Sequence, residues 1–201
     1  MSTTPVVLLT GFEPFSGQPF NASDEGVRMF CEAGELGERA DVSWRILPVV
    51  YDEAALRLEE AIDELKPEVV IALGICDESC YRIERVANNL DDTEVPDNKA
   101  EVRRSLRIIE DGPDRYEAPY SHVELARRLE EKGLPWRFSD SAGGFLCNHV
   151  FYHLCRLAAS PRRAVHAATF LHVPPLAEGD ELGGLIEAIG CAVEAALDSV
   201  S

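Results

Sequence analysis

The sequence predicts an α/β fold in which a sheet lies between layers of helices. Up to Gly74, apolar runs suited to buried strands alternate with segments of helical periodicity, in the order strand, helix, strand, helix, strand. The run Val69–Leu73 is apolar throughout, as in strands that are buried on both faces of a parallel sheet. With 201 residues, no internal repeat and no linker-like tract, residues 1–201 are predicted to form one domain.

The first strand is expected at Pro5–Thr10, an apolar run that Gly11 ends. The loop that follows, Thr10–Asn21, contains two prolines and two glycines, so it is expected to be irregular. It carries three aromatic side chains that either cover the core or form a binding pocket, namely Phe12, Phe15 and Phe20. Asn21 or Ser23 is suited to cap the next helix, whose apolar stripe contains Val27, Phe30 and Cys31.

A second strand is expected at Val42–Tyr51, and Pro48 within it places this strand at an edge or end of the sheet. The helix Asp52–Lys66 follows, with Leu, Ile and Ala side chains on one face and a proline directly after it. The apolar third strand comes next, and beyond it Tyr81–Asn88 is expected to be extended.

The connection from Val95 to Tyr120 is charged and irregular, and within it only Leu106–Ile109 is predicted to form a short strand. A long connection of this kind in a compact domain is typical of a lid or an oligomer contact. Ser121–Glu124 has the pattern of a capping box, which predicts a helix that ends at Gly133.

The C-terminal third continues the alternation of strands and helices. A short strand at Trp136–Ser139 leads to the segment Ser141–Leu154, in which helical spacing begins at Val150. His166–Val173 is predicted to be a strand that two prolines stop, and Glu181–Asp198 is a strongly amphipathic helix.

The composition excludes several classes of protein. The chain has 36 Asp and Glu against 19 Lys and Arg, a formal charge of -17, which opposes binding to nucleic acid or to anionic lipid. No apolar stretch approaches the ~18 continuous residues of a membrane span. The run Val6–Leu9 is too short for a signal-peptide core, and three of the six cysteines, at 31, 155 and 191, fall on apolar helix stripes. A reducing cytoplasm is therefore the expected location.

Cys147 is the candidate nucleophile. A Gly-Gly pair precedes it, and it lies at or near the start of a predicted helix. Unpaired N–H groups at a helix start favour negative charge, so a thiol there is expected to ionise more readily and to have donors nearby for an oxyanion. The alternative is an inert cysteine that packs in the core.

A thiol nucleophile needs a base within hydrogen-bond reach, and His172 is the best candidate. It lies at the carboxyl end of a predicted strand, where the ligands of open α/β sheets bind and helix N-termini point. His149 lies two residues after Cys147 and His153 six, so both point away from it around the helix. The alternative for His172 is a half-buried histidine bonded to a loop.

The residues alone do not identify the acid that orients this base. Glu84 follows the buried third strand and is within reach of the same sheet edge, but an ion pair with Arg82 or Arg85 also explains it. A zinc site is a competing interpretation, because Cys76 with Cys80 and His149 with His153 form two spaced pairs. Nothing independent brings the two pairs together.

Several segments together resemble the pyroglutamyl peptidase I family of cytosolic cysteine peptidases, also called pyrrolidone carboxyl peptidases. The likeness covers nearly the whole chain and is carried by L-L-T-G-F-E-P-F-S-G, L-P-V-V-Y, E-R-V-A-N-N-L-D-D, V-P-D-N, S-A-G-G-F-L-C-N-H-V-F-Y and F-L-H-V-P. It implies removal of an N-terminal pyroglutamate (5-oxoproline) from peptides. It also implies a single-domain α/β/α fold of the phosphorylase/hydrolase-like kind, with a twisted, mixed, largely parallel sheet.

The resemblance also implies roles for individual residues. Cys147 matches the nucleophile, His172 the base and Glu84 its orienting acid. The pocket for the pyroglutamyl ring is implied at Phe12 and Phe15 with support from Asn21, bordered by Phe145 and Leu146. A homotetramer, or a dimer, is the implied assembly, and no metal or organic cofactor is implied.

The chain departs from the family pattern at three places near this site. Ile75 stands where the family has a glutamine, within a stretch that is one residue shorter. Glu94 stands in place of an arginine, and Val49 in place of a threonine. These changes leave two alternatives open: a cysteine hydrolase that acts on another small amide or lactam, or a weakly active paralogue that binds its ligand.

Overall fold

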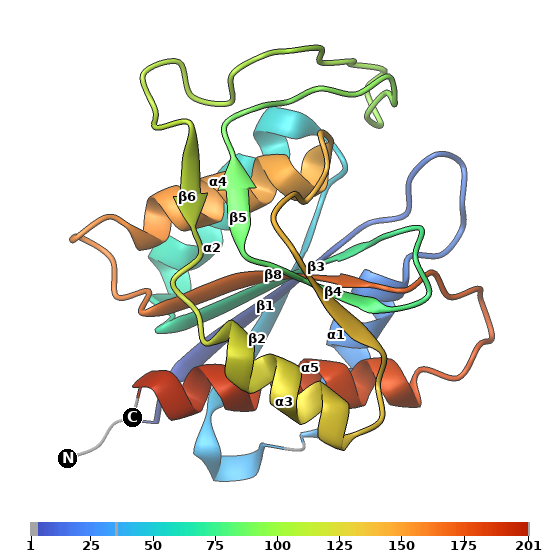
Figure 1. Ribbon diagram of the computed structural model, residues 1–201, viewed down its shortest axis with the longest axis vertical. Coiled ribbons are helices and arrows are strands. Elements are labelled where there is room, and N and C mark those ends of the chain that lie inside the picture. The colour runs from blue at the N-terminus through green and yellow to red at the C-terminus, as the bar shows by residue number, and fades with distance from the viewer. Residues whose placement is uncertain (1–3, 35, 201) are drawn as a thin grey trace.

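The computed structural model describes residues 4–34 and 36–200, which form a sheet with helices on both faces (Figure 1). Of residues 1–201, residues 1–3, 35 and 201 lie outside the described part. The elements are, in chain order, β1 (Val6–Phe12), α1 (Ala22–Ala33), a short 3-10 helix (Gly37–Arg39), β2 (Asp41–Leu47), α2 (Tyr51–Leu65), β3 (Val69–Ile75), β4 (Tyr81–Glu84), β5 (Val86–Asn88), β6 (Arg115–Glu117), α3 (His122–Glu131), β7 (Trp136–Ser139), α4 (Leu146–Ala158), β8 (Ala167–Val173) and α5 (Gly183–Val200).

The central sheet has the strand order β2-β1-β3-β8-β4-β7. All neighbouring pairs are parallel except β4 and β8, which are antiparallel. The prediction of a mixed, largely parallel sheet is therefore confirmed. Strand β2 is at the edge, as Pro48 indicated, and the chain leaves the sheet just before this proline.

Alternate side chains of the central strands build two hydrophobic cores, one on each face. Val7 and Leu9 of β1 join the core under α1, α3 and α5, whereas Leu8 belongs to the core under α2 and α4. Figure 1 shows α2 and α4 on one side of the sheet and the other three helices on the opposite side. This is the predicted layered arrangement.

Several local predictions were wrong. Leu106–Ile109 is not a strand, since Leu106 makes only an isolated bridge with Asp91. The strand that this long connection does contain is β6, which pairs with β5 in a separate two-stranded sheet. Ser121 makes no side-chain capping bond, although α3 begins directly after it. Phe12 ends strand β1 and is buried, so it is not part of the loop.

Across the described residues, the model contains no helix whose length and apolar character would suffice to cross a membrane.

Candidate active site

A cavity of about 400 Å³ opens at the carboxyl ends of β1, β3 and β8. This is the edge where the sequence predicted a site. Seven of the eight predicted site residues line it, namely Phe12, Phe15, Asn21, Phe145, Leu146, Cys147 and His172, and Glu84 lies directly behind His172. The topology brings them together because parallel strands deliver their following loops to one edge.

Cys147 is in the first turn of α4, as the glycine-rich approach indicated. Phe145, the N-cap residue, is extended and makes no side-chain cap, so the first N–H groups of the helix have no capping side chain. The expectation of a readily ionised thiol was wrong, because the pKa of Cys147 lies above its ordinary value. Burial raises the pKa of Cys147 to about 12, and the Glu84 carboxylate adds to this, while Arg82 and the backbone N–H oppose it.

His172 and Glu84 form a buried pair. The Nδ1 nitrogen of His172 donates to Glu84 Oε1 at 2.8 Å, which leaves Nε2 as the proton-accepting nitrogen. Both side chains are secluded from solvent, with exposed fractions of 4% for His172 and 0% for Glu84. The two residues meet because β4 runs antiparallel to β8, with Arg82 opposite His172 and Glu84 opposite Phe170.

The remaining wall of the cavity is aromatic. Phe15 and Phe145 approach to 6.1 Å between ring centroids, and Phe12 packs on Phe170 at 6.5 Å. Asn21 caps α1 by accepting a bond from the Ser23 N–H at 3.0 Å, and its Nδ2 donates to the Glu13 carbonyl at 3.1 Å. Asn21 thereby fixes the loop that presents Phe15.

One cavity brings together a thiol, an imidazole–carboxylate pair, uncapped helix N–H groups and an apolar pocket. Known proteins share the fold that builds this cavity. A family model described as pyroglutamyl peptidase matches residues 6–184. The chain belongs to this family of cysteine peptidases.

Relatives and solved structures agree with this membership. A pyrrolidone-carboxylate peptidase of Cupriavidus taiwanensis is 40% identical over 176 residues, which cover 87% of this chain and 80% of the relative. That of Thermosipho melanesiensis is 36% identical over 169 residues, 84% of this chain and 82% of the relative. The pyroglutamyl peptidase I of Bacillus amyloliquefaciens superposes with a TM-score of 0.89 at 28% identity, covering 96% of this chain and 97% of that one. A mutant pyrrolidone carboxyl peptidase of Pyrococcus furiosus gives 0.89 at 30% identity, covering 98% and 100%.

Two of the three departures from the family pattern face the cavity of this pyroglutamyl peptidase family member. Ile75 and Val49 line it, and the Val49 N–H donates to Glu13 Oε1 at 3.0 Å. Glu94 does not line it but forms an ion pair with Arg104 at the surface. Glu94, one of the three departures placed near the site, therefore lies outside the cavity.

Sequence reasoning missed one polar residue that supports the site, Asn148, and considered a second, Arg82, only as an alternative ion-pair partner of Glu84. Asn148 follows Cys147, is fully buried, and donates to the carbonyls of Asn88 and Leu90 at 2.8 and 2.9 Å. Arg82 lines the cavity and contacts Glu84 Oε1 at 2.8 Å. The period of two along a strand is a signal for Arg82, because it puts residues 82 and 84 on the same face.

The residues of the competing zinc interpretation do not converge. His149 Nδ1 donates to Asp91 Oδ2 at 2.9 Å, away from the cavity. The Cys76 thiol donates instead to the Val173 carbonyl at 3.4 Å. Among residues 4–34 and 36–200, no group of three or more His, Cys, Asp or Glu side chains is arranged to hold a metal ion.

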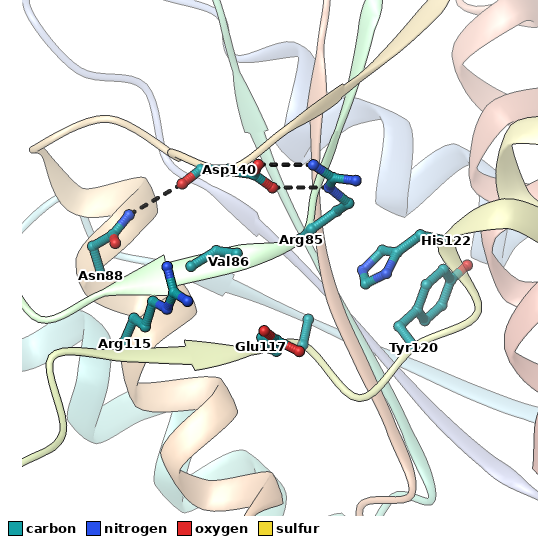
Figure 2. A pocket seen from close by; sticks show the side chains of 9 residues that line it. Arg85, Val86, Asn88, Arg115, Glu117, Tyr120, His122 and Asp140 are labelled. Carbon is teal, nitrogen blue, oxygen red and sulfur yellow. Dashed lines mark hydrogen bonds and ion pairs between the residues drawn. The ribbon is translucent and has the colours of Figure 1, made fainter.

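A second, larger cavity of about 550 Å³ lies beside the antiparallel pair of β5 and β6 and the start of α3 (Figure 2). None of the predicted site residues lines it. Arg85 and Asp140 form a two-pronged ion pair, and His122 lies beside Arg85, next to Tyr120. Burial, with help from Arg85, lowers the pKa of His122 to about 4.

Proposed function

We propose that this protein is a cysteine exopeptidase that removes N-terminal pyroglutamate from peptides through a thioester on Cys147. The observation that carries the proposal is the 2.8 Å bond between His172 Nδ1 and Glu84 in the cavity wall that also holds the thiol. The names of the relatives, pyrrolidone-carboxylate peptidase and pyroglutamyl peptidase I, supply the substrate.

The first half of the reaction forms the thioester. Because the free thiol is neutral at pH 7, its proton moves to His172 Nε2 as the sulfur attacks the carbonyl of the pyroglutamyl group. Glu84 stabilises the resulting imidazolium. The developing oxyanion accepts bonds from the N–H groups at the start of α4.

The second half releases both products. His172 donates its proton to the nitrogen of the leaving amine, the C–N bond breaks, and a pyroglutamyl thioester remains on Cys147. Water then loses a proton to His172 and attacks the thioester. The C–S bond breaks, His172 returns its proton to the sulfur, and free pyroglutamate leaves with the thiol restored.

The pocket suits a ring that carries no charge. A pyroglutamyl group has no ammonium for an acidic side chain to recognise, so selectivity has to come from shape and from amide hydrogen bonds. Phe12, Phe15, Phe145 and Leu146 provide an apolar wall, and Asn21 holds the loop that carries Phe15.

A second candidate function is hydrolysis of another small amide or lactam by the same residues. It is favoured by Ile75 and Val49, which put apolar side chains where the family pattern has polar ones. A third, a paralogue that binds without useful turnover, rests on the same two positions.

Release of a fluorophore from pyroglutamyl aminomethylcoumarin separates these functions. We expect turnover by the unmodified protein, none by Cys147→Ala, and normal turnover by the control Cys80→Ala, whose thiol lies outside the cavity. Turnover of other amides but not of this substrate supports the second function. Binding of pyroglutamate without turnover of any amide supports the third, and undiminished turnover by Cys147→Ala contradicts the thiol mechanism.

We further propose a cytoplasmic location and a homotetrameric or dimeric assembly. Four large apolar side chains that are exposed in one protomer lie in the long connection after β5, namely Leu90, Val95, Val102 and Leu106, which supports an oligomer contact there. Light scattering during gel filtration tests the assembly, and a monomeric mass at micromolar concentration contradicts it.

A further inference from the structure

Arg82 occupies an unusual position in the site. Among the described residues that line the cavity it is the sole lysine or arginine, and its side chain is only 14% exposed. It precedes Glu84 by two residues in β4, so both side chains leave the strand on one face.

The guanidinium of Arg82 is held at several points. Its Nη2 contacts Glu84 Oε1 at 2.8 Å, the same oxygen that accepts the bond from His172. Nη2 also donates to the Ser141 carbonyl at 2.6 Å and to Ser139 Oγ at 3.2 Å. Arg82 therefore joins the predicted acid to the turn that leads to the nucleophile.

That turn is also fixed from the opposite side. Asp140 lies between the two serines, and its carboxylate accepts hydrogen bonds from Nε and Nη2 of Arg85. Its backbone carbonyl accepts a bond from Asn88 Nδ2 at 3.3 Å (Figure 2). The turn has little freedom to adapt when Arg82 is changed, so a shorter side chain cannot recover these contacts by a movement of the turn.

Glu84 depends on this contact. Its side chain is fully buried, and Oε2 has no hydrogen-bond partner within the described structure. A buried carboxylate is costly unless it is paired, and Oε1 carries both of its partners. Removing Arg82 leaves His172 as the one partner of this side chain among the described residues, which favours rotation of the carboxyl group away from His172.

The thiol responds to the same charges. The titratable and charged groups that face Cys147 are Glu84 and Arg82 from β4, Cys76 and Asp77 from the loop after β3, and His172 from β8. Among the groups that act on its pKa, Arg82 is the positive charge that favours the thiolate, and Glu84 and Cys76 oppose it.

We propose that Arg82 is a positioning residue: it holds the Glu84 carboxylate directed at His172 Nδ1, and it offsets the negative charge of Glu84 at the thiol. The inference rests on the proposed peptidase function for its kinetic consequence, but its electrostatic consequence can be measured on the thiol alone.

The test compares Arg82→Gln, Arg82→Lys and the control Arg137→Gln. Arg137 pairs with Glu78, the outer partner of Arg82, but it is half exposed and does not touch Glu84. Two quantities are measured: the rate at which iodoacetamide alkylates the peptide that contains Cys147, as a function of pH, and kcat and KM for pyroglutamyl aminomethylcoumarin.

We expect Arg82→Gln to slow alkylation at pH 7 by about tenfold or more, the equivalent of one pKa unit, and to shift the alkylation profile to higher pH. The same variant is expected to lower kcat by a similar factor with little change in KM. Arg82→Lys keeps the charge without the planar fork, so it should restore the alkylation profile and part of kcat. Arg137→Gln should match the unmodified protein in both assays.

A wild-type alkylation profile together with wild-type kcat in Arg82→Gln overturns the inference, and so does an equal loss in Arg137→Gln. If Arg82→Gln does not fold, Arg82→Lys decides, since a folded Lys variant with the profile of the unmodified protein supports the charge role and a strongly shifted profile contradicts it. If the unmodified protein does not cleave the substrate, the proposed function fails, while alkylation still tests Arg82.

Discussion

At Gly74 any side chain would enter the space that the thiol of Cys147 occupies. A Cβ atom built there lies 2.8 Å from Cys147 Sγ and 2.8 Å from Phe170 Cζ. Gly74 is also the register partner of His172 in the parallel pair of β3 and β8. The close contact between the Cys147 thiol and β3 therefore depends on a glycine near the end of this strand.

We expect Gly74→Ala to displace the thiol, to lower kcat/KM for pyroglutamyl aminomethylcoumarin by about tenfold or more, and to destabilise the fold by about 1–3 kcal/mol through overpacking. Gly184→Ala is the matched control, because the nearest atom to its added Cβ is 3.4 Å away. Urea unfolding and steady-state kinetics measure both effects. Activity within twofold of the unmodified protein would show that the thiol does not need this space.

Single residues of the site differ in how far the sequence could reveal them. Cys147 and His172 were found because each lies at an element end that topology sends to one edge. Glu84 came only from the family resemblance, because 36 carboxylates offered too many candidates. The ionisation of the thiol was predicted wrongly, since burial outweighs a helix start, and burial depends on contacts that are distant in the sequence.

At the scale of elements, helices α1 and α5 show how close packing sets the tolerance for side chains. Gly26 of α1 faces Leu185 of α5, and an added Cβ would lie 2.6 Å from Leu185 Cδ2. Gly190, on α5, has its nearest neighbour, Phe30 Cε2, at 3.5 Å, an ordinary contact.

The same substitution should therefore have opposite effects at these two positions. Gly190→Ala is expected to stabilise by up to about 1 kcal/mol through helix propensity and to raise Tm by roughly 2–4 °C. Gly26→Ala is expected to destabilise by about 1–3 kcal/mol, because the clash outweighs the propensity gain. Calorimetry measures both, and a higher Tm for Gly26→Ala would mean that the two helices are not packed this closely.

Most element positions were predictable because the apolar pattern is local. Strand β7 matches its predicted bounds, and α2 is displaced by only one residue at each end. Strand β6 was missed because three residues pair with β5 across a long connection, and such short pairs leave little periodicity to detect. Leu106–Ile109 was taken for a strand on its apolar residues, although it makes a single bridge.

For the whole molecule, two partly buried histidines link stability to pH. Burial, with added repulsion from His149 and Arg156, lowers the pKa of His153 to about 3, and the pKa of His122 falls to about 4. Because both lie below the ordinary value of 6.5, the unfolded chain binds more protons than the folded one between these values. Stability is therefore present above pH 6.5 and declines as the pH falls toward these folded-state pKa values.

We expect the free energy of unfolding to fall as the pH drops from about 6.5 to 4, by at most about 1.4 kcal/mol per pH unit for each histidine. His153→Gln removes one of the two groups and should show a shallower decline. His166→Gln, a change at an exposed histidine before β8, should decline like the unmodified protein. Urea titrations across this range measure the slopes, and an unchanged slope in His153→Gln would contradict the assignment.

The architecture as a whole was predictable in class but not in strand order. Alternating strands and helices indicated a layered, parallel sheet, which the structure confirms. The position of β8 between β3 and β4 could not be predicted. It results from backbone pairing between segments almost a hundred residues apart, which no local pattern encodes. This pairing brings His172 to Glu84, so the same long-range step that escaped prediction assembles the site.

In the proposed mechanism Cys147 carries the pyroglutamyl group during turnover. The most direct test is acid quenching of the protein during turnover of a pyroglutamyl substrate, followed by mass spectrometry of its proteolytic peptides. We expect a thioester-linked pyroglutamyl group on the peptide that contains Cys147, and no such group when Cys147→Ala is used. Continued turnover by Cys147→Ala, or an adduct on another residue that forms and decays at the turnover rate, would contradict it.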